Sequence, residues 1–186
     1  MSAAESVRLC GGRRTWLGLV LQACAALAWA QDDLGPDELH VKAAFLYKFT
    51  SYVDWPEGAF AGADGPFLVG VQGADALYGE LGQLVASRKV HERAVLVRRL
   101  VPGESTAGLH MLFAGRGSAL RAEPGRPVLV VTEAEGEMPL GSMINFRLVE
   151  RRVRFDIALD AVETAGLRMS SRLLAVARRV YRAGGS

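Results

Sequence analysis

Short apolar segments, separated by stretches long enough for a helix, are the feature that most limits the possible folds of this chain. Four such segments occupy residues 67–71, 94–97, 109–114 and 128–132. They are near-continuous apolar runs, a pattern typical of strands buried on both faces of a parallel sheet. Residues 76–87 lie between the first two segments and carry leucines at helical spacing. This alternation predicts a single α/β domain with a mainly parallel sheet flanked by helices.

The C-terminal part of the chain has a different pattern. Residues 143–149 and 153–159 alternate apolar and polar side chains, which predicts a β-hairpin with one face in water. Two helices are expected to close the chain, over residues 160–166 and 170–180. The first opens with an acidic residue and carries another three residues later, the spacing of a capping box.

A long first helix is predicted to begin near Asp37 and to stop before Trp55-Pro56, because a residue that precedes proline is pushed out of the helical region. Aromatic residues are concentrated here within 16 positions, at Phe45, Tyr47, Phe49, Tyr52, Trp55 and Phe60. Such density indicates either a deeply buried helix or a helix whose apolar face is left for a partner. Both alternatives require the same side chains.

The first 30 residues have the features of an export signal. Two arginines precede a short apolar run, and Ala28-Trp29-Ala30 offers small residues at the positions that a signal peptidase reads. The run is shorter than the ~20 residues that a membrane-spanning helix needs. We therefore expect a cleaved signal peptide over residues 1–30 and a flexible leader over residues 31–36. Lipidation of Cys24, within a loose lipobox, is the alternative.

Loss of the signal changes the charge and the cysteine content. The chain has 22 Lys and Arg residues against 20 Asp and Glu residues, and 19 of each remain after residue 30. A neutral chain without a clustered basic face argues against a nucleic-acid partner. Both cysteines, Cys10 and Cys24, leave with the signal. The mature chain can therefore form no disulfide and offers no thiolate.

The search for catalytic chemistry in the sequence is negative. His40, His91 and His110 share no metal-ligand spacing, and no nucleophile elbow, phosphate-binding loop or zinc-protease motif follows a predicted strand. We predict a protein that is not an enzyme, with no catalytic residues, no metal and no cofactor.

Two sets of charged residues have a simple structural interpretation. Arg154 and Asp156 lie two apart on a predicted strand and so share a face, which suggests a surface ion pair. Arg178 and Arg179 are expected on the solvated face of the last helix.

Two separated blocks of the chain resemble one known family. The first block is residues 41–56 (VKAAFLYKFTSYVDWP). The second comprises residues 141–146 (GSMINF), 153–157 (VRFDI) and 165–174 (AGLRMSSRLL). In this order and spacing they resemble the YfiR-like family of bacterial periplasmic proteins, and residues 37–183 would form the YfiR-like domain.

The resemblance implies a periplasmic regulator without catalysis. The best-known members repress an inner-membrane diguanylate cyclase by engaging its periplasmic sensor domain, and an OmpA-like peptidoglycan-associated lipoprotein can draw them away. The resemblance therefore implies a link to cyclic di-GMP signalling and biofilm, and a homodimer. Other relatives occur beside sensor kinases and outer-membrane receptors. This chain departs from the best-known members in having no disulfide, and in having Asp156 where glutamate is more frequent.

These considerations give two hypotheses about sites. The first is an interface with a partner or a second copy, formed by a few large anchors. Its expected residues are Tyr47, Lys48, Tyr52, Trp55, Pro56, Phe146 and Arg154. The second hypothesis is a binding protein for a small aromatic or anionic metabolite, with the ligand in the crevice beyond the carboxyl ends of the parallel strands. Gly73, Gly115 and Thr132 are expected there.

Overall fold

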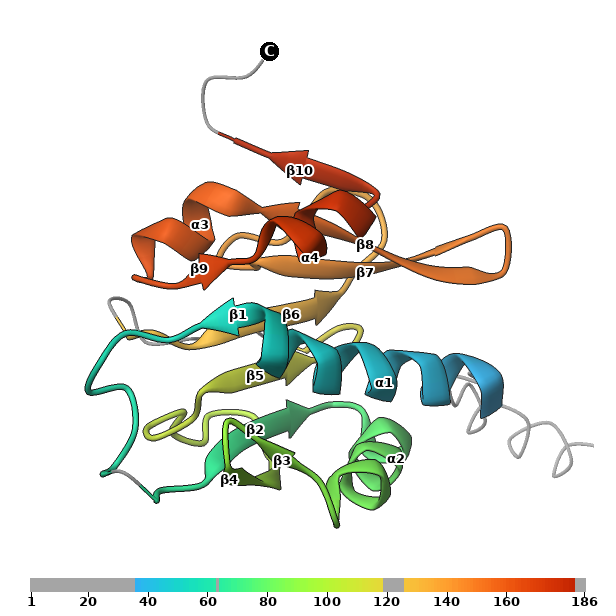
Figure 1. The fold of residues 1–186 in the computed structure, drawn as a ribbon. Helices are drawn as coiled ribbons and strands as arrows, with labels where there is room; N and C mark the ends of the chain where they lie inside the picture. The colour runs from blue at the N-terminus through green and yellow to red at the C-terminus, as the bar shows by residue number, and fades with distance from the viewer. Residues whose placement is uncertain (1–35, 63, 119–125, 183–186) are drawn as a thin grey trace, which may run out of the picture. The chain divides into compact units, whose positions relative to one another are not determined.

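The fold is built on a mixed β-sheet whose central strands are parallel (Figure 1). The computed structural model describes residues 36–62, 64–118 and 126–182. The expected signal peptide and the alternative lipidation site at Cys24 lie outside these residues, as does the expected leader except for Pro36. No helix in the described ranges is long and apolar enough to cross a membrane.

Within the described residues the main sheet has eight strands in the order β10-β8-β7-β6-β5-β2-β4-β3. Five neighbouring strands run parallel. They are β4 (Arg93–Leu100), β2 (Phe67–Gln72), β5 (Met111–Ala114), β6 (Leu129–Glu133) and β7 (Ile144–Val149). Every residue of β5 and β6 is buried, as expected for apolar strands covered on both faces. The α/β class and the four apolar strands are confirmed.

Antiparallel pairing occurs at both ends of this parallel core, so the sheet is mixed. β8 (Arg152–Ala158) forms the expected hairpin with β7, through a turn in which Glu150 and Arg151 have φ angles of 49° and 60°. β3 (Lys89–Val90) pairs antiparallel with β4 at the other end. β10 (Arg179–Tyr181) pairs parallel with β8 and forms the edge of the sheet.

The two closing helices are present, but their ends differ from the prediction. α3 (Leu159–Thr164) starts after Ala158, which makes no side-chain cap, so the expected capping box at Asp160 is wrong: Asp160 already lies inside the first turn. Gly166, with a φ angle of 73°, follows the end of α3. The sequence predicts Ser170 or Ser171 as the cap of the last helix, and the structure selects Ser170, whose hydroxyl accepts a hydrogen bond in the first turn of α4.

The last helix is shorter than predicted. α4 (Ser171–Val176) ends well before Val180, and the chain continues into β10. The backbone N–H of Arg178 donates to the carbonyl of Phe155 at 2.8 Å, and the Arg178 side chain binds Asp156. The expectation that Arg178 and Arg179 lie on a solvated helix face is therefore wrong, since tertiary pairing with β8 replaces the last helical turn.

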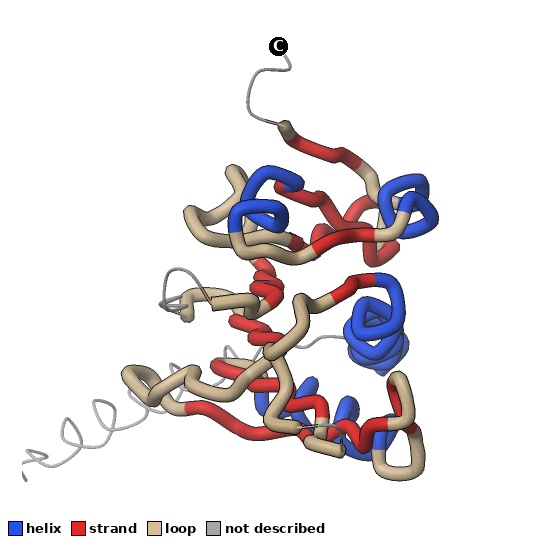
Figure 2. The backbone as a smooth tube through the Cα atoms, turned by 60° about the vertical axis from the view of Figure 1, so that its left-hand side comes forward, coloured by secondary structure: helices blue, strands red, loops and turns tan. Residues whose placement is uncertain are grey.

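Helix α1 (Pro36–Tyr52) covers one face of the sheet, which we call the helix face (Figures 1 and 2). It packs beside α2 (Asp75–Val85), and its C-terminal half contacts α4. β1 (Val53–Asp54) follows α1 directly and pairs with β9 (Arg168–Met169) in a separate two-stranded sheet. This small sheet ties the end of α1 to the C-terminal elements.

Much of the aromatic cluster on α1 belongs to the core. Phe49 is completely buried, and its ring centroid lies 5.9 Å from that of Phe146 and 5.2 Å from that of Phe155. Phe45 packs on the same two rings. The helix is therefore buried along one stripe, whereas Tyr47, a neighbour on its other side, remains half-buried.

Candidate partner-binding groove and polar centres

A groove of about 380 Å³ opens between the C-terminal half of α1, strand β8 and helix α4. We call it the α1–β8 groove. Its lining residues are Phe45, Lys48, Phe49, Tyr52, Val153, Arg154, Phe155, Arg172, Leu173 and Val176. Two residues of the expected interface, Lys48 and Tyr52, lie together in it, and a third, Arg154, belongs to the strand at its base.

Helical periodicity explains how the side chains from α1 meet. Phe45, Phe49 and Tyr52 lie four and three positions apart, so they line one side of α1, and Lys48 lies beside them. Phe155 of β8 packs against this side of the helix, so the neighbouring Arg154 side chain points to the other face of the sheet, as Asp156 does. The contribution of α4 was missed by sequence reasoning. The signal that could have indicated it is the mixture of apolar and cationic residues in a helix with few acidic residues.

The other expected interface residues lie elsewhere. Phe146 is a core residue that is 1% exposed. Trp55 is half-buried, and its indole N–H donates to the His110 carbonyl at 3.1 Å. Tyr47 faces the groove between α1 and α2, and Pro56 is exposed in the loop that follows β1. Whether these four residues contact a partner stays a prediction.

The residues expected in the ligand crevice do approach one another. A Cβ atom on Gly115 would lie 2.4 Å from the carbonyl oxygen of Gly73, so the loops after β5 and β2 are in direct backbone contact. Thr132 is buried, and its hydroxyl donates to Asn145 Oδ1 at 2.7 Å and lies 2.7 Å from Ser142 Oγ. Their role in ligand binding stays a prediction.

A cavity of about 200 Å³ lies close to this edge, at the carboxyl ends of β6 and β7. An ion-pair network forms part of its wall. Lys42 is only 2% exposed, and its Nζ lies 2.6 Å from Glu38 Oε1 and 2.9 Å from Glu133 Oε1. Arg116 Nε lies 3.0 Å from the same Glu133 oxygen. The sequence signal was a lysine between apolar helix positions, because a buried lysine needs a carboxylate partner.

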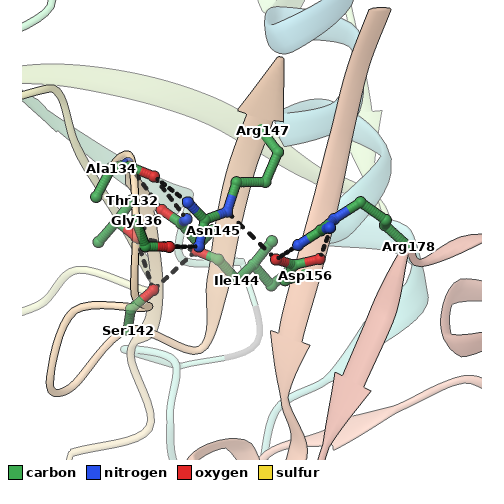
Figure 3. Close-up of polar contacts among 9 residues, drawn as sticks. All are labelled: Thr132, Ala134, Gly136, Ser142, Ile144, Asn145, Arg147, Asp156 and Arg178. Carbon is green, nitrogen blue, oxygen red and sulfur yellow. Dashed lines mark hydrogen bonds and ion pairs between the residues drawn. The ribbon is translucent and has the colours of Figure 1, made fainter. Parts of the chain in front are cut away.

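A second buried charge lies on the outer face of the sheet, opposite α1 (Figure 3). Asp156 is completely buried, and it accepts hydrogen bonds from Arg178 Nε at 2.7 Å and from Arg147 Nε at 3.3 Å. The hydrogen bond to Asp156 raises the pKa of the Arg178 guanidinium. The expected surface pair between Arg154 and Asp156 is therefore wrong, because residues 147 and 178 cover the carboxylate.

His110 forms a third buried polar centre. Its Nδ1 accepts the backbone N–H of Leu68 at 2.9 Å, and the Phe60 ring stacks on the imidazole with centroids 4.3 Å apart. Arg93 lies over the Phe60 ring at 4.3 Å from its centroid. Burial is the largest cause of a lowered pKa for His110. The neutral ring is thus the form that the fold accommodates.

The charged groups of the first two polar centres bind their neighbours within the fold, whereas the α1–β8 groove is one of the open surfaces. In the described part of the chain, no group of three or more His, Cys, Asp and Glu side chains could hold a metal ion. The fold defines the class: a small α/β domain with a mixed sheet.

Comparison with known families agrees with the resemblance found in the sequence. The family model described as YfiR/HmsC-like matches residues 39–178, and the chain belongs to this family of periplasmic regulators. No curated protein matches the chain.

Proposed function

We propose that this protein is an exported, non-catalytic regulator that represses an inner-membrane diguanylate cyclase by contact with the periplasmic sensor domain of that enzyme. The observation that carries the proposal is family membership over residues 39–178. The α1–β8 groove supports it, because two of the residues expected at the interface, Lys48 and Tyr52, meet there. Repression would lower cyclic di-GMP and restrain biofilm formation.

Deletion of the gene in its host tests this proposal. We expect cellular cyclic di-GMP and surface attachment to rise, and the wild-type gene to reverse both. Complementation with Arg172→Gln should restore less than complementation with Arg152→Gln. Arg152 is the matched control because it is also an exposed arginine but does not line the groove. An unchanged cyclic di-GMP level would remove the cyclase as the target and favour an adaptor to a sensor kinase or receptor.

The proposal includes two further partners. A homodimer is expected, and an OmpA-like peptidoglycan-associated lipoprotein is the expected competitor that releases the cyclase. Light scattering of the purified protein measures the first, and capture of envelope proteins by the tagged protein in its host tests the second. A monomer at all concentrations would contradict the dimer.

A small-molecule binding protein is the second candidate function, and one observation favours it. The cavity of about 200 Å³ lies beside the carboxyl ends of parallel strands, where α/β folds commonly bind ligands. A ligand bound there would raise the melting temperature in a saturable way. Lys42→Met, which removes the cavity's buried cation, should abolish that rise, whereas a ligand effect that persists in this variant would place the ligand elsewhere.

A further inference from the structure

The end of the β7–β8 hairpin extends beyond the rest of the sheet as a two-stranded ribbon (Figure 1). β7 pairs with β6 only as far as Phe146, whereas its pairing with β8 continues to Val149. On the other side, β10 pairs with β8 only from Asp156 onward. Residues 147–154 therefore have no strand pairing outside the hairpin, and we call them the hairpin tip.

The hairpin tip presents apolar side chains on both of its faces. Leu148 is 51% exposed and Val149 is 38% exposed. Adjacent residues of a strand point to opposite faces. Leu148 accordingly lies opposite Val153 on one face, and Val149 lies opposite Arg152 on the other. A partner that packed on one face of the ribbon would leave the apolar side chain of the other face in water, whereas an environment that surrounds the tip covers both.

The hairpin tip is also strongly cationic. It contains four arginines and one acidic residue, Glu150. Arg147 is held by the buried carboxylate of β8 and by two carbonyl oxygens. Arg151, Arg152 and Arg154 are exposed, and none of them has a carboxylate partner among the described residues. Three guanidinium groups thus remain for an external anion.

This combination is suited to the surface of an anionic membrane. Protruding apolar side chains with cations around them are the chemistry by which amphipathic helices bind at the boundary between headgroups and acyl chains. Arginine holds a phosphate through a planar fork of N–H groups. An acidic protein surface would match the charges of the hairpin tip, but it would cover only one face of the ribbon.

We propose that the hairpin tip binds the surface of an anionic phospholipid bilayer. Leu148 and Val149 enter the headgroup region, and Arg151, Arg152 and Arg154 pair with the lipid phosphates. This binding needs no cyclase and goes beyond the proposed function. Only its benefit, a position beside an inner-membrane enzyme, rests on that function.

Cosedimentation of the mature protein with lipid vesicles tests the proposal. We expect binding to vesicles of equal parts phosphatidylglycerol and phosphatidylcholine, and no binding to vesicles of phosphatidylcholine alone. The triple variant Arg151→Gln/Arg152→Gln/Arg154→Gln should bind the anionic vesicles about a hundred-fold more weakly, since each cation near an anionic surface contributes about five-fold. Absence of binding by the wild-type protein would overturn the proposal, and hairpin-dependent binding to an acidic protein in its place would assign the tip to a protein partner.

The matched control is the triple variant Lys48→Gln/Arg168→Gln/Arg172→Gln. It removes the same number of exposed cations from elements outside the hairpin, so the net charge changes equally. This variant should bind the anionic vesicles far more tightly than the hairpin variant does. Equal losses in the two variants would overturn the proposal, because net charge rather than the hairpin tip would then account for the binding.

Fluorescence tests the insertion of the apolar side chains. The emission of Val149→Trp should shift to the blue with anionic vesicles, whereas that of Val101→Trp, at another exposed apolar site, should not. Trp55 is the one tryptophan after residue 30 and gives the baseline. Leu148→Ser/Val149→Ser keeps all the arginines and should bind on the order of ten-fold more weakly than the wild type. An unshifted emission of Val149→Trp, or unchanged binding of the double variant, would overturn the insertion.

The vesicle measurements and the gene deletion can fail separately. Absence of vesicle binding would remove the membrane site and leave the proposed regulator, whereas an unchanged cyclic di-GMP level would remove the cyclase and leave the membrane site. In the host, Arg152→Gln alone keeps two of the three cations and both apolar side chains. Its comparison with Arg172→Gln therefore still tests the α1–β8 groove.

Discussion

Asp156 shows how a single residue can join distant parts of the chain. Its carboxylate lies between a guanidinium from the neighbouring strand and another from residue 178, as Figure 3 shows. Both arginines are partly buried, and they would remain beside a neutral group if the charge were removed. Removing one partner of a buried ion pair costs more stability than replacing both partners, because the remaining charge is left unpaired.

We therefore expect Asp156→Asn to lower the free energy of unfolding by about 3 kcal/mol or more, as measured by urea denaturation. Arg154→Gln is the matched control, since Arg154 is an exposed residue of the same strand face and should change stability by less than about 1 kcal/mol. Equal costs for the two variants would show that Asp156 is not a structural ion-pair centre.

His110 predicts a pH dependence of stability. Burial lowers the pKa of His110 in the folded protein, so the unfolded chain takes up a proton at a higher pH than the folded protein does. Stability from this group is present above the unfolded pKa of about 6.5 and is lost as the pH falls toward the folded pKa. The slope from one such group is at most about 1.4 kcal/mol per pH unit.

Urea denaturation at pH values from about 7.5 down to about 5, on both sides of the ordinary histidine pKa of about 6.5, measures this effect. His110→Asn retains an acceptor for the Leu68 N–H and cannot be protonated there, so it should lose this part of the pH dependence. His40→Gln alters an exposed side chain and should keep it. The same slope in wild type and His110→Asn would contradict a buried neutral imidazole.

At the scale of single residues, the sequence predicts the exposed residues that line the groove better than it predicts the partners of the buried charged residues. Lys48 and Tyr52 were identifiable because they lie in the first of the two blocks that resemble the family. The pairing of Asp156 with Arg178 was not, because it depends on a strand that the local sequence does not indicate. Residue 178 follows a helix of high local propensity, and only its contacts with β8 show that the helix has ended.

At the scale of the elements, the length of a strand decides whether the local sequence predicts it. The long apolar strands carry their own signal, because burial on both faces requires continuous apolar residues. β1, β3, β9 and β10 have only two or three residues each. β3 pairs with the adjacent start of β4, whereas β1, β9 and β10 exist by pairing with segments that are distant in the sequence. Val53 pairs with Met169, for example, and no local pattern predicts that contact.

Helix α4 offers a test of local stability. Ser170 accepts the backbone N–H of Leu173 through its hydroxyl at 3.3 Å, so it caps the helix that carries Arg172 into the groove. Ser170→Ala should lower the free energy of unfolding by about 1 kcal/mol, the usual cost of losing a cap. Ser171→Ala is the matched control, because Ser171 is exposed and begins the helix without capping it. If thermal denaturation gives the same melting temperature for both variants, the cap contributes nothing to stability.

At the scale of the whole molecule, charge is distributed unevenly although its sum is small. The formal net charge of the chain is +2, yet two cations, Lys48 and Arg172, line the α1–β8 groove and no acidic residue does. The fold class could be predicted because the alternation of strands and helices extends over much of the chain. The groove could not, because α1 and α4 lie more than a hundred positions apart and only the sheet brings them together.

This uneven charge predicts that partner binding weakens in salt. Raising the ionic strength from 0.1 M to 1 M shortens the screening length from about 10 Å to about 3 Å, which removes most of the attraction between exposed charges. The wild-type protein should therefore bind its partner less tightly at high salt. The double variant with glutamine at residues 48 and 172 should bind weakly at both salt concentrations, with little dependence on salt. An affinity of the wild type that is constant or rises with salt would mean that apolar burial alone holds the partner, since salt strengthens apolar association rather than weakening it.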